Sequence, residues 1–106
     1  MAFSIQQDSD GQTVRLVGEL DLATADRLIE HLAPILPPQG DLRLNLEGLR
    51  FMDSSGIRAL IQLCQQLGGR GRLVLHSPSG FVARLLEVIR ADTFPNWVVE
   101  GDGQAH

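Results

Sequence analysis

The segment from Leu42 to Leu75 changes its hydrophobic period twice, and no other feature of the chain constrains the fold as strongly. Leucines occupy every second position of "DLRLNL", a pattern typical of a half-buried strand. Apolar residues then recur at helical spacing until "LGGRG" ends the helix, and "RLVLH" follows as a short strand. A strand, helix and strand in this order predict a parallel β-α-β unit with a right-handed crossover. The residues expected on the buried face of this helix are Ile57, Leu60, Ile61, Cys64 and Leu67.

The flanking segments extend this unit into an α/β pattern. "AFSIQQ" and "TVRLVGEL" alternate on either side of an Asp10-Gly11 turn, which predicts an antiparallel hairpin. A helical period begins at about Ala23 and ends at "PILPPQG". "SPSGFVARLLEVI" predicts a third helix with Ser77 as its cap and Pro78 in its first turn, and "NWVVE" predicts a final edge strand. We therefore expect an α/β fold, a mixed sheet with an opening antiparallel hairpin, then parallel β-α-β units, and helices packed on it.

Length and composition describe a globular protein of one domain. The chain has 106 residues, of which 43% are hydrophobic and 21% are charged. We expect one domain over residues 1–100 and a flexible C-terminal tail over residues 101–106.

Charge and targeting signals exclude several classes of function. A net charge of −4 argues against a nucleic-acid partner. No stretch is long and apolar enough to insert into a membrane, and the N-terminus lacks a signal peptide. The single Cys64 fits a reducing cytoplasm and is expected to be a small core residue. The chain has no Cys/His cluster for a metal, and we expect no cofactor.

Polar residues gather at the strand–helix junction in "RFMDSSGIRAL". We expect the strand to end near Glu47, Phe51 and Met52 to lie in a connection, and the helix to start at about Ser54. One helix cap needs one acceptor, whereas Asp53, Ser54 and Ser55 offer three. The Gly56 that follows gives no helical advantage and is expected to leave the hydroxyls uncovered.

Three interpretations of this junction are open. Asp53 or Ser54 caps the helix and does nothing more, which is the commonest role of such residues. Alternatively, Ser54 is a hydrolytic nucleophile with His76 as the most plausible base, although no G-x-S-x-G elbow is present. In the third interpretation Ser54 accepts a phosphate, which adds about −1.5 to −2 charges at a helix N-terminus. A partner that docks on this surface would then meet a bulky dianion, so the phosphate acts as an on/off switch.

"LNLEGLRFMDSSGIRALIQL" resembles the signature of bacterial anti-sigma-factor antagonists, which belong to the STAS domain family. "VRLVGELDLATADRLIEHL" and "GGRGRLVLHSPSGFVARLLEVI" resemble further parts of the same family, so that the resemblance covers nearly the whole chain. It implies a phosphoprotein that acts in transcription regulation by partner switching. The unphosphorylated protein binds an anti-sigma factor with a histidine-kinase-like ATPase fold and thereby releases the sigma factor. That kinase then phosphorylates the antagonist, and a metal-dependent serine phosphatase reverses the modification.

The resemblance also implies roles for individual residues. Ser54 matches the phosphorylated serine, and the protein is a kinase substrate and binding protein rather than an enzyme. The positions expected to contact the partner are Asp21, Thr24, Asp53, Ser55, Gly56 and Arg58. Asp21 is equally plausible as the cap of the first helix, and Thr24 is better explained by a role at the start of that helix. Arg58 replaces a glycine of many family members and is typical of a solvated helix residue.

A second function from another class fits the same fold. The chain could be a STAS interaction module that does not cycle through phosphate, within a stress-signalling assembly or as a soluble subunit of a membrane transport complex. The Asp53-Ser54 pair favours the antagonist without excluding this alternative.

Overall fold

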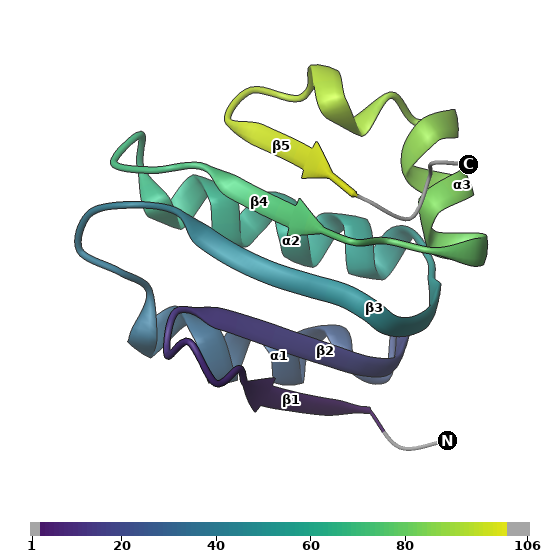
Figure 1. The fold of residues 1–106 in the computed structure, drawn as a ribbon, viewed down its shortest axis with the longest axis horizontal. Coiled ribbons are helices and arrows are strands. Elements are labelled where there is room, and N and C mark those ends of the chain that lie inside the picture. Colours follow the sequence, from purple (N-terminus) through teal and green to yellow (C-terminus); the bar gives the residue numbers. More distant parts are fainter. Residues whose placement is uncertain (1–2, 102–106) are drawn as a thin grey trace.

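A computed structural model describes residues 3–101 as a five-stranded sheet with three α-helices (Figure 1). The strands are β1 (Ser4–Gln7), β2 (Thr13–Leu20), β3 (Leu42–Met52), β4 (Leu73–His76) and β5 (Trp97–Glu100), and the helices are α1 (Ala25–Leu32), α2 (Ser54–Leu67) and α3 (Gly80–Val88). Short 3-10 turns cover Ala33–Ile35 and Ala91–Thr93. No helix in this part of the chain is long and apolar enough to cross a membrane.

The strands lie in chain order, β1-β2-β3-β4-β5. β1 pairs antiparallel with β2, and each later strand pairs in parallel with its predecessor. At the hairpin, the Asp10 carboxylate accepts hydrogen bonds from the backbone N–H groups of Gln12 and Thr13, both at 2.8 Å. These findings confirm the predicted fold class, including the opening hairpin, the β-α-β unit and the final edge strand.

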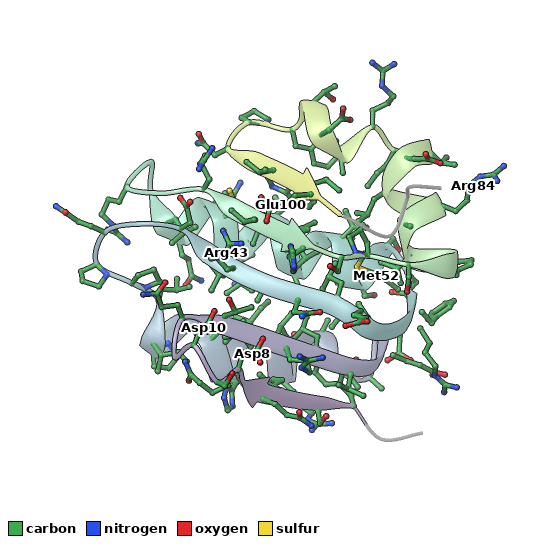
Figure 2. All side chains as sticks on the ribbon, viewed as in Figure 1. Asp8, Asp10, Arg43, Met52, Arg84 and Glu100 are labelled. Atoms are coloured by element: carbon green, nitrogen blue, oxygen red, sulfur yellow. The ribbon has the colours of Figure 1, made fainter. Side chains whose placement is uncertain are left out.

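Helices α1 and α2 lie on one side of the sheet, and leucines fill the layer between them and the strands (Figure 1). Leu16 and Leu44 of the sheet and Leu28 and Leu60 of the helices are fully buried in this core. The opposite face carries charged side chains, several of which are labelled in Figure 2. Ion pairs join them across neighbouring strands, as between Arg43 and Glu100 at 3.0 Å.

Strand β3 is longer than the sequence predicted, because it continues past Glu47 to Met52. Its pairing with β2 shifts register twice, between Arg15 and Val17 and between Gly18 and Glu19. At each shift β3 advances one residue more than β2, which is the signature of a bulge. The bulges break the alternation of apolar and polar residues, which is why the sequence predicts a short connection where the structure continues the strand to Met52.

Helices α2 and α3 also differ in detail from the prediction. The buried residues of α2 are Gly56, Ala59, Leu60, Leu63 and Leu67. Ile61 is 36% exposed. Cys64 is half-buried at the edge of the core, where burial raises the pKa of its thiol. The helical face is therefore rotated slightly from the one predicted, toward the small residues that allow close packing.

Helix α3 begins at Gly80, with Ser79 in the N-cap position, rather than at Pro78 with Ser77 as cap. The backbone of Ser77 has a φ of +58°, which is not a helical or capping conformation. Its N–H donates to the carbonyl of Glu100 at 2.8 Å, so that the chain still pairs with the β5 side before it turns. This hydrogen bond to a residue far along the chain holds Ser77 outside the helix, so that α3 starts later than the sequence predicts. The tail predicted over 101–106 lies, apart from Gly101, outside the described residues.

Candidate functional site

At the junction between β3 and α2, the residue that caps the helix is Asp53. This residue has an extended backbone and occupies the N-cap position. Its Oδ1 accepts hydrogen bonds from the N–H of Ser55 at 2.8 Å and from that of Gly56 at 3.4 Å. Of the three polar residues at the junction, one therefore satisfies the free N–H groups of the helix.

Ser54 is the first residue of α2 and is exposed. Its hydroxyl makes no hydrogen bond to any residue between 3 and 101. Ser55, by contrast, is half-buried. Because the cap is made by Asp53, a group added to the Ser54 oxygen breaks no bond that holds the helix. This hydroxyl lies at the positive end of the helix dipole, where a phosphate is stabilised.

Gly56 has a packing role that the sequence did not indicate. It is buried, and a Cβ built on it would lie 2.6 Å from Cγ of Met52 and 2.9 Å from the carbonyl oxygen of Leu20. The prediction that this glycine leaves the hydroxyls uncovered is wrong, because its missing side chain faces β2 and β3. It lets the first turn of α2 approach the ends of both strands.

The loop after β2 lies beside this junction, because the N–H of Asp53 donates to the carbonyl of Leu20 at 3.3 Å. Within the loop, Oδ1 of Asp21 accepts a hydrogen bond from the N–H of Ala23 at 3.0 Å and lies 3.2 Å from the hydroxyl oxygen of Thr24. Thr24 rather than Asp21 occupies the N-cap position of α1, without a side-chain capping bond.

The Thr24 hydroxyl stabilises the same loop through hydrogen bonds to its backbone. It donates to the carbonyl of Glu19 at 2.9 Å and accepts from the N–H of Asp21 at 2.9 Å. Thr24 and Asp21 are both half-buried. The two side chains thus fix the loop that runs alongside the Ser54 site, which agrees with a structural role for Thr24.

Arg58 lies on the exposed side of α2 and lines a shallow groove of about 110 Å³ between α1 and α2. Leu22, Ile29 and Ser55 line the same groove. Among residues 3–101, no carboxylate forms an ion pair with Arg58. The side chain of Arg58 is exposed, and the carboxylate that lines the same groove belongs to Asp26 of α1.

The histidine proposed as a base for Ser54 lies elsewhere. His76 pairs with Asn45 across β3 and β4, seven residues before Met52 along β3. Its Nδ1 lies 3.1 Å from Oε1 of Glu100. The other described histidine, His31, is in the last turn of α1. The structure therefore contradicts the nucleophile interpretation that used His76.

An aromatic pair beside the junction was not singled out from the sequence. Phe51, near the end of β3, stacks on Phe81 in the first turn of α3, with ring centroids 5.2 Å apart and an interplanar angle of 18°. Phe81 remains 53% exposed. The signal available in the sequence was a phenylalanine at the start of a helix, which is ambiguous without knowledge of the strand that it meets.

The family model described as "Mlab, STAS domain" matches residues 3–100 of the chain. The chain belongs to the STAS domain family. Among curated proteins, this STAS domain is similar to the anti-sigma-B factor antagonist of Bacillus subtilis (strain 168). The two sequences are 28% identical over 85 residues, which cover 79% of this chain and 78% of that protein.

Two solved structures share the fold of this STAS domain. A candidate anti-sigma factor antagonist from Thermotoga maritima has a TM-score of 0.68 and 18% identity, over 94% of this chain and 86% of that one. The anti-sigma factor antagonist SpoIIAA in its unphosphorylated form has a TM-score of 0.62 and 24% identity, over 92% and 86%. Both structures, like the Bacillus subtilis relative, carry the name of an anti-sigma factor antagonist. Together with the family match, they support the resemblance found in the sequence.

Proposed function

We propose that this STAS domain is an anti-sigma-factor antagonist of the cytoplasm, switched by phosphorylation of Ser54. In the unphosphorylated form it binds a serine-kinase anti-sigma factor with a histidine-kinase-like ATPase fold, which then releases its sigma factor. Phosphate on Ser54 ends the binding, and a metal-dependent phosphatase restores it. The observation that carries this proposal is the exposed hydroxyl of Ser54, which is free of hydrogen bonds within residues 3–101 while Asp53 caps the helix.

The switch acts through local electrostatics. A phosphate adds about −1.5 to −2 charges beside Asp53, and near the loop that carries Asp21. The cap bonds from Asp53 remain, so the fold is retained while a partner that docks there meets a bulky dianion. Asp21, Asp53, Ser55 and Arg58 are the side chains that we assign to partner contact, whereas Gly56 and Thr24 act by placing them.

The test uses the purified protein and the kinase-type anti-sigma factors of its source organism. Ser54→Ala should retain binding but block transfer of phosphate from ATP. Ser54→Asp should weaken binding, with a partial effect because one carboxylate carries less charge than phosphate. Ser9→Ala is the matched control, since it removes an exposed hydroxyl in the hairpin turn at the opposite end of the sheet and should leave both binding and phosphate transfer to Ser54 intact.

Two results would contradict the proposal. One is equal affinity of wild type, Ser54→Asp and phosphorylated protein for an anti-sigma factor that binds. The other is phosphate transfer that persists in Ser54→Ala and disappears in Ser55→Ala. Melting temperatures of all variants should match, because the cap is made by Asp53.

The non-cycling interaction module is the second candidate, in a stress-signalling assembly or a membrane transport complex. It is favoured by one observation, namely that the Asp53 cap accounts for much of the motif without any phosphate. Phosphopeptide mass spectrometry of the protein from its own cells, in growth and under stress, separates the two candidates. Phosphate on Ser54 that changes with condition supports the antagonist, and a Ser54 that is never modified while a partner is bound supports the module.

A further inference from the structure

The outward face of α3 carries large apolar side chains that the fold leaves in solvent. Phe81 is 53% exposed, and Val88, two turns later, is 67% exposed. Arg84 lies between them, one turn after Phe81, and Figure 2 shows its side chain extending away from the ribbon. Residues at these spacings share one face of a helix.

The exposed ring of Phe81 is connected to the Ser54 junction through the residue that it stacks on. Its stacking partner Phe51 stands three residues before Ser54, in the strand that leads into α2. The stack holds Phe81 in one orientation at the end of the sheet where Asp53 begins the helix. A partner that covers Ser54 and extends toward α3 therefore meets a pre-ordered aromatic surface, which loses little side-chain freedom on binding.

Within the described residues, the fold leaves the guanidinium groups of Arg58, Arg84 and Arg90 without a carboxylate partner. In a chain with a net charge of −4, Arg15, Arg43, Arg50 and Arg72 are each paired with a carboxylate. Arg84 has no ion-pair or hydrogen-bond partner for its guanidinium within the described residues. An unpaired guanidinium beside an exposed aromatic ring is complementary to an apolar side chain accompanied by a carboxylate.

We propose that Phe51, Phe81 and Arg84 form a second docking region for the anti-sigma factor, here named the α3 patch. The occupant is a segment of that protein which places an apolar side chain on the exposed Phe81 ring and a carboxylate at Arg84. The inference rests on the proposed function and adds to it the partner's chemistry and its extension from α2 onto α3. Ser54 then lies within the covered area rather than at its border, so a phosphate there must lose its water on binding.

The experiment measures the Kd of wild type and of single variants for one anti-sigma factor. That factor is chosen because wild type binds it in a Ser54-dependent manner. Phe81→Ala should raise Kd about tenfold, because truncation of an aromatic anchor in an interface costs more than about 1 kcal/mol. Arg84→Glu should also raise Kd, and more strongly at low salt than at high salt. The matched controls are Val88→Ala, an exposed apolar residue at the far end of α3, and Arg90→Glu, an equal charge change beyond its end.

Hydrogen exchange of the wild-type complex tests the same contact without a substitution. Slower exchange in residues 80–88 on binding is the expected result. Unchanged exchange there, or equal Kd for Phe81→Ala, Val88→Ala and wild type, overturns the α3 patch while the Ser54 switch stands. If no kinase-type anti-sigma factor of the organism binds wild type, the proposed function fails and the α3 patch fails with it. Melting temperatures show whether Phe81→Ala remains folded without the stack.

Discussion

At the scale of single residues, consecutive polar residues at the junction between β3 and α2 have different roles. Asp53 stands just before α2 and Ser55 within its first turn, and the Asp53 carboxylate accepts hydrogen bonds from two N–H groups of that turn. Ser54 is left for solvent and Gly56 for close packing. Because of this separation, the phosphate that we propose on Ser54 would leave the hydrogen bonds of the helix cap unchanged.

Gly56→Ala should destabilise the fold. The added methyl group would lie 2.6 Å from Cγ of Met52 and 2.9 Å from the Leu20 oxygen, and such overpacking costs about 1–3 kcal/mol. The better helix propensity of alanine returns at most about 1 kcal/mol. Urea denaturation should show a lower midpoint for Gly56→Ala, with Ser54→Ala as an exposed control in the same turn. A midpoint equal to that of wild type would show that β2 and α2 can move apart at no cost.

At the scale of elements, the end of β3 determines where α2 begins, because one residue, Asp53, separates them. Strand β3 continues through two bulges, past the residues in which apolar and polar side chains alternate. Its last residue, Met52, pairs with Leu20, and the next residue, Asp53, caps α2. Any change in this register would move Asp53 relative to the loop after β2, since its N–H bonds to Leu20. The position of Ser54 is therefore set by strand pairing as well as by its own helix.

Two substitutions of Asp53 distinguish the hydrogen bonds of its side chain to α2 from its negative charge. Asp53→Ala should cost about 1 kcal/mol of stability, because it removes the acceptor for Ser55 and Gly56. Asp53→Asn keeps an amide oxygen in a residue that caps nearly as well, so it should retain most of that stability. Thermal unfolding measures both variants. Equal losses in the two would indicate that the charge on Asp53, rather than its hydrogen bonds, supports the helix.

At the scale of the whole molecule, the two ends of the sheet serve different purposes. Asp10 and Asp41 lie at the end opposite the Ser54 junction, in the hairpin turn and before β3. Hydrogen bonds from Gln12 N–H and Thr13 N–H lower the pKa of Asp10, and those from Arg72, first its backbone N–H, lower the pKa of Asp41. Asp41 thereby joins the starts of β3 and β4, far along the chain from each other.

These carboxylates should make stability depend on acid pH. Because their folded pKa values lie below the ordinary 3.8, their contribution is fully present above 3.8 and is lost as the pH falls through the lowered values. Asp41→Asn should lower stability at neutral pH and weaken its decline in acid. Urea unfolding at a series of pH values measures this. Asp26→Asn on α1, whose carboxylate accepts no hydrogen bond within residues 3–101, controls for the loss of one charge, and identical pH profiles for wild type and Asp41→Asn would contradict the argument.

The sequence by itself determined the order of the elements, the hairpin, the parallel β-α-β unit and the motif at Asp53 and Ser54. All of these depend on local patterns, namely hydrophobic period, turn chemistry and short motifs, which a single chain displays without knowledge of distant contacts. The family resemblance rests on the same local information.

Only the tertiary structure decided which polar residue caps α2, how far β3 extends, where α3 begins and what surrounds Gly56. Each depends on pairing between segments far apart in the chain, such as Ser77 with Glu100 or Met52 with Leu20. The contact of Phe51 with Phe81, thirty residues later, is of the same kind. Long-range register has no local signature, because a strand's neighbours are fixed by the sheet that it joins rather than by its own residues.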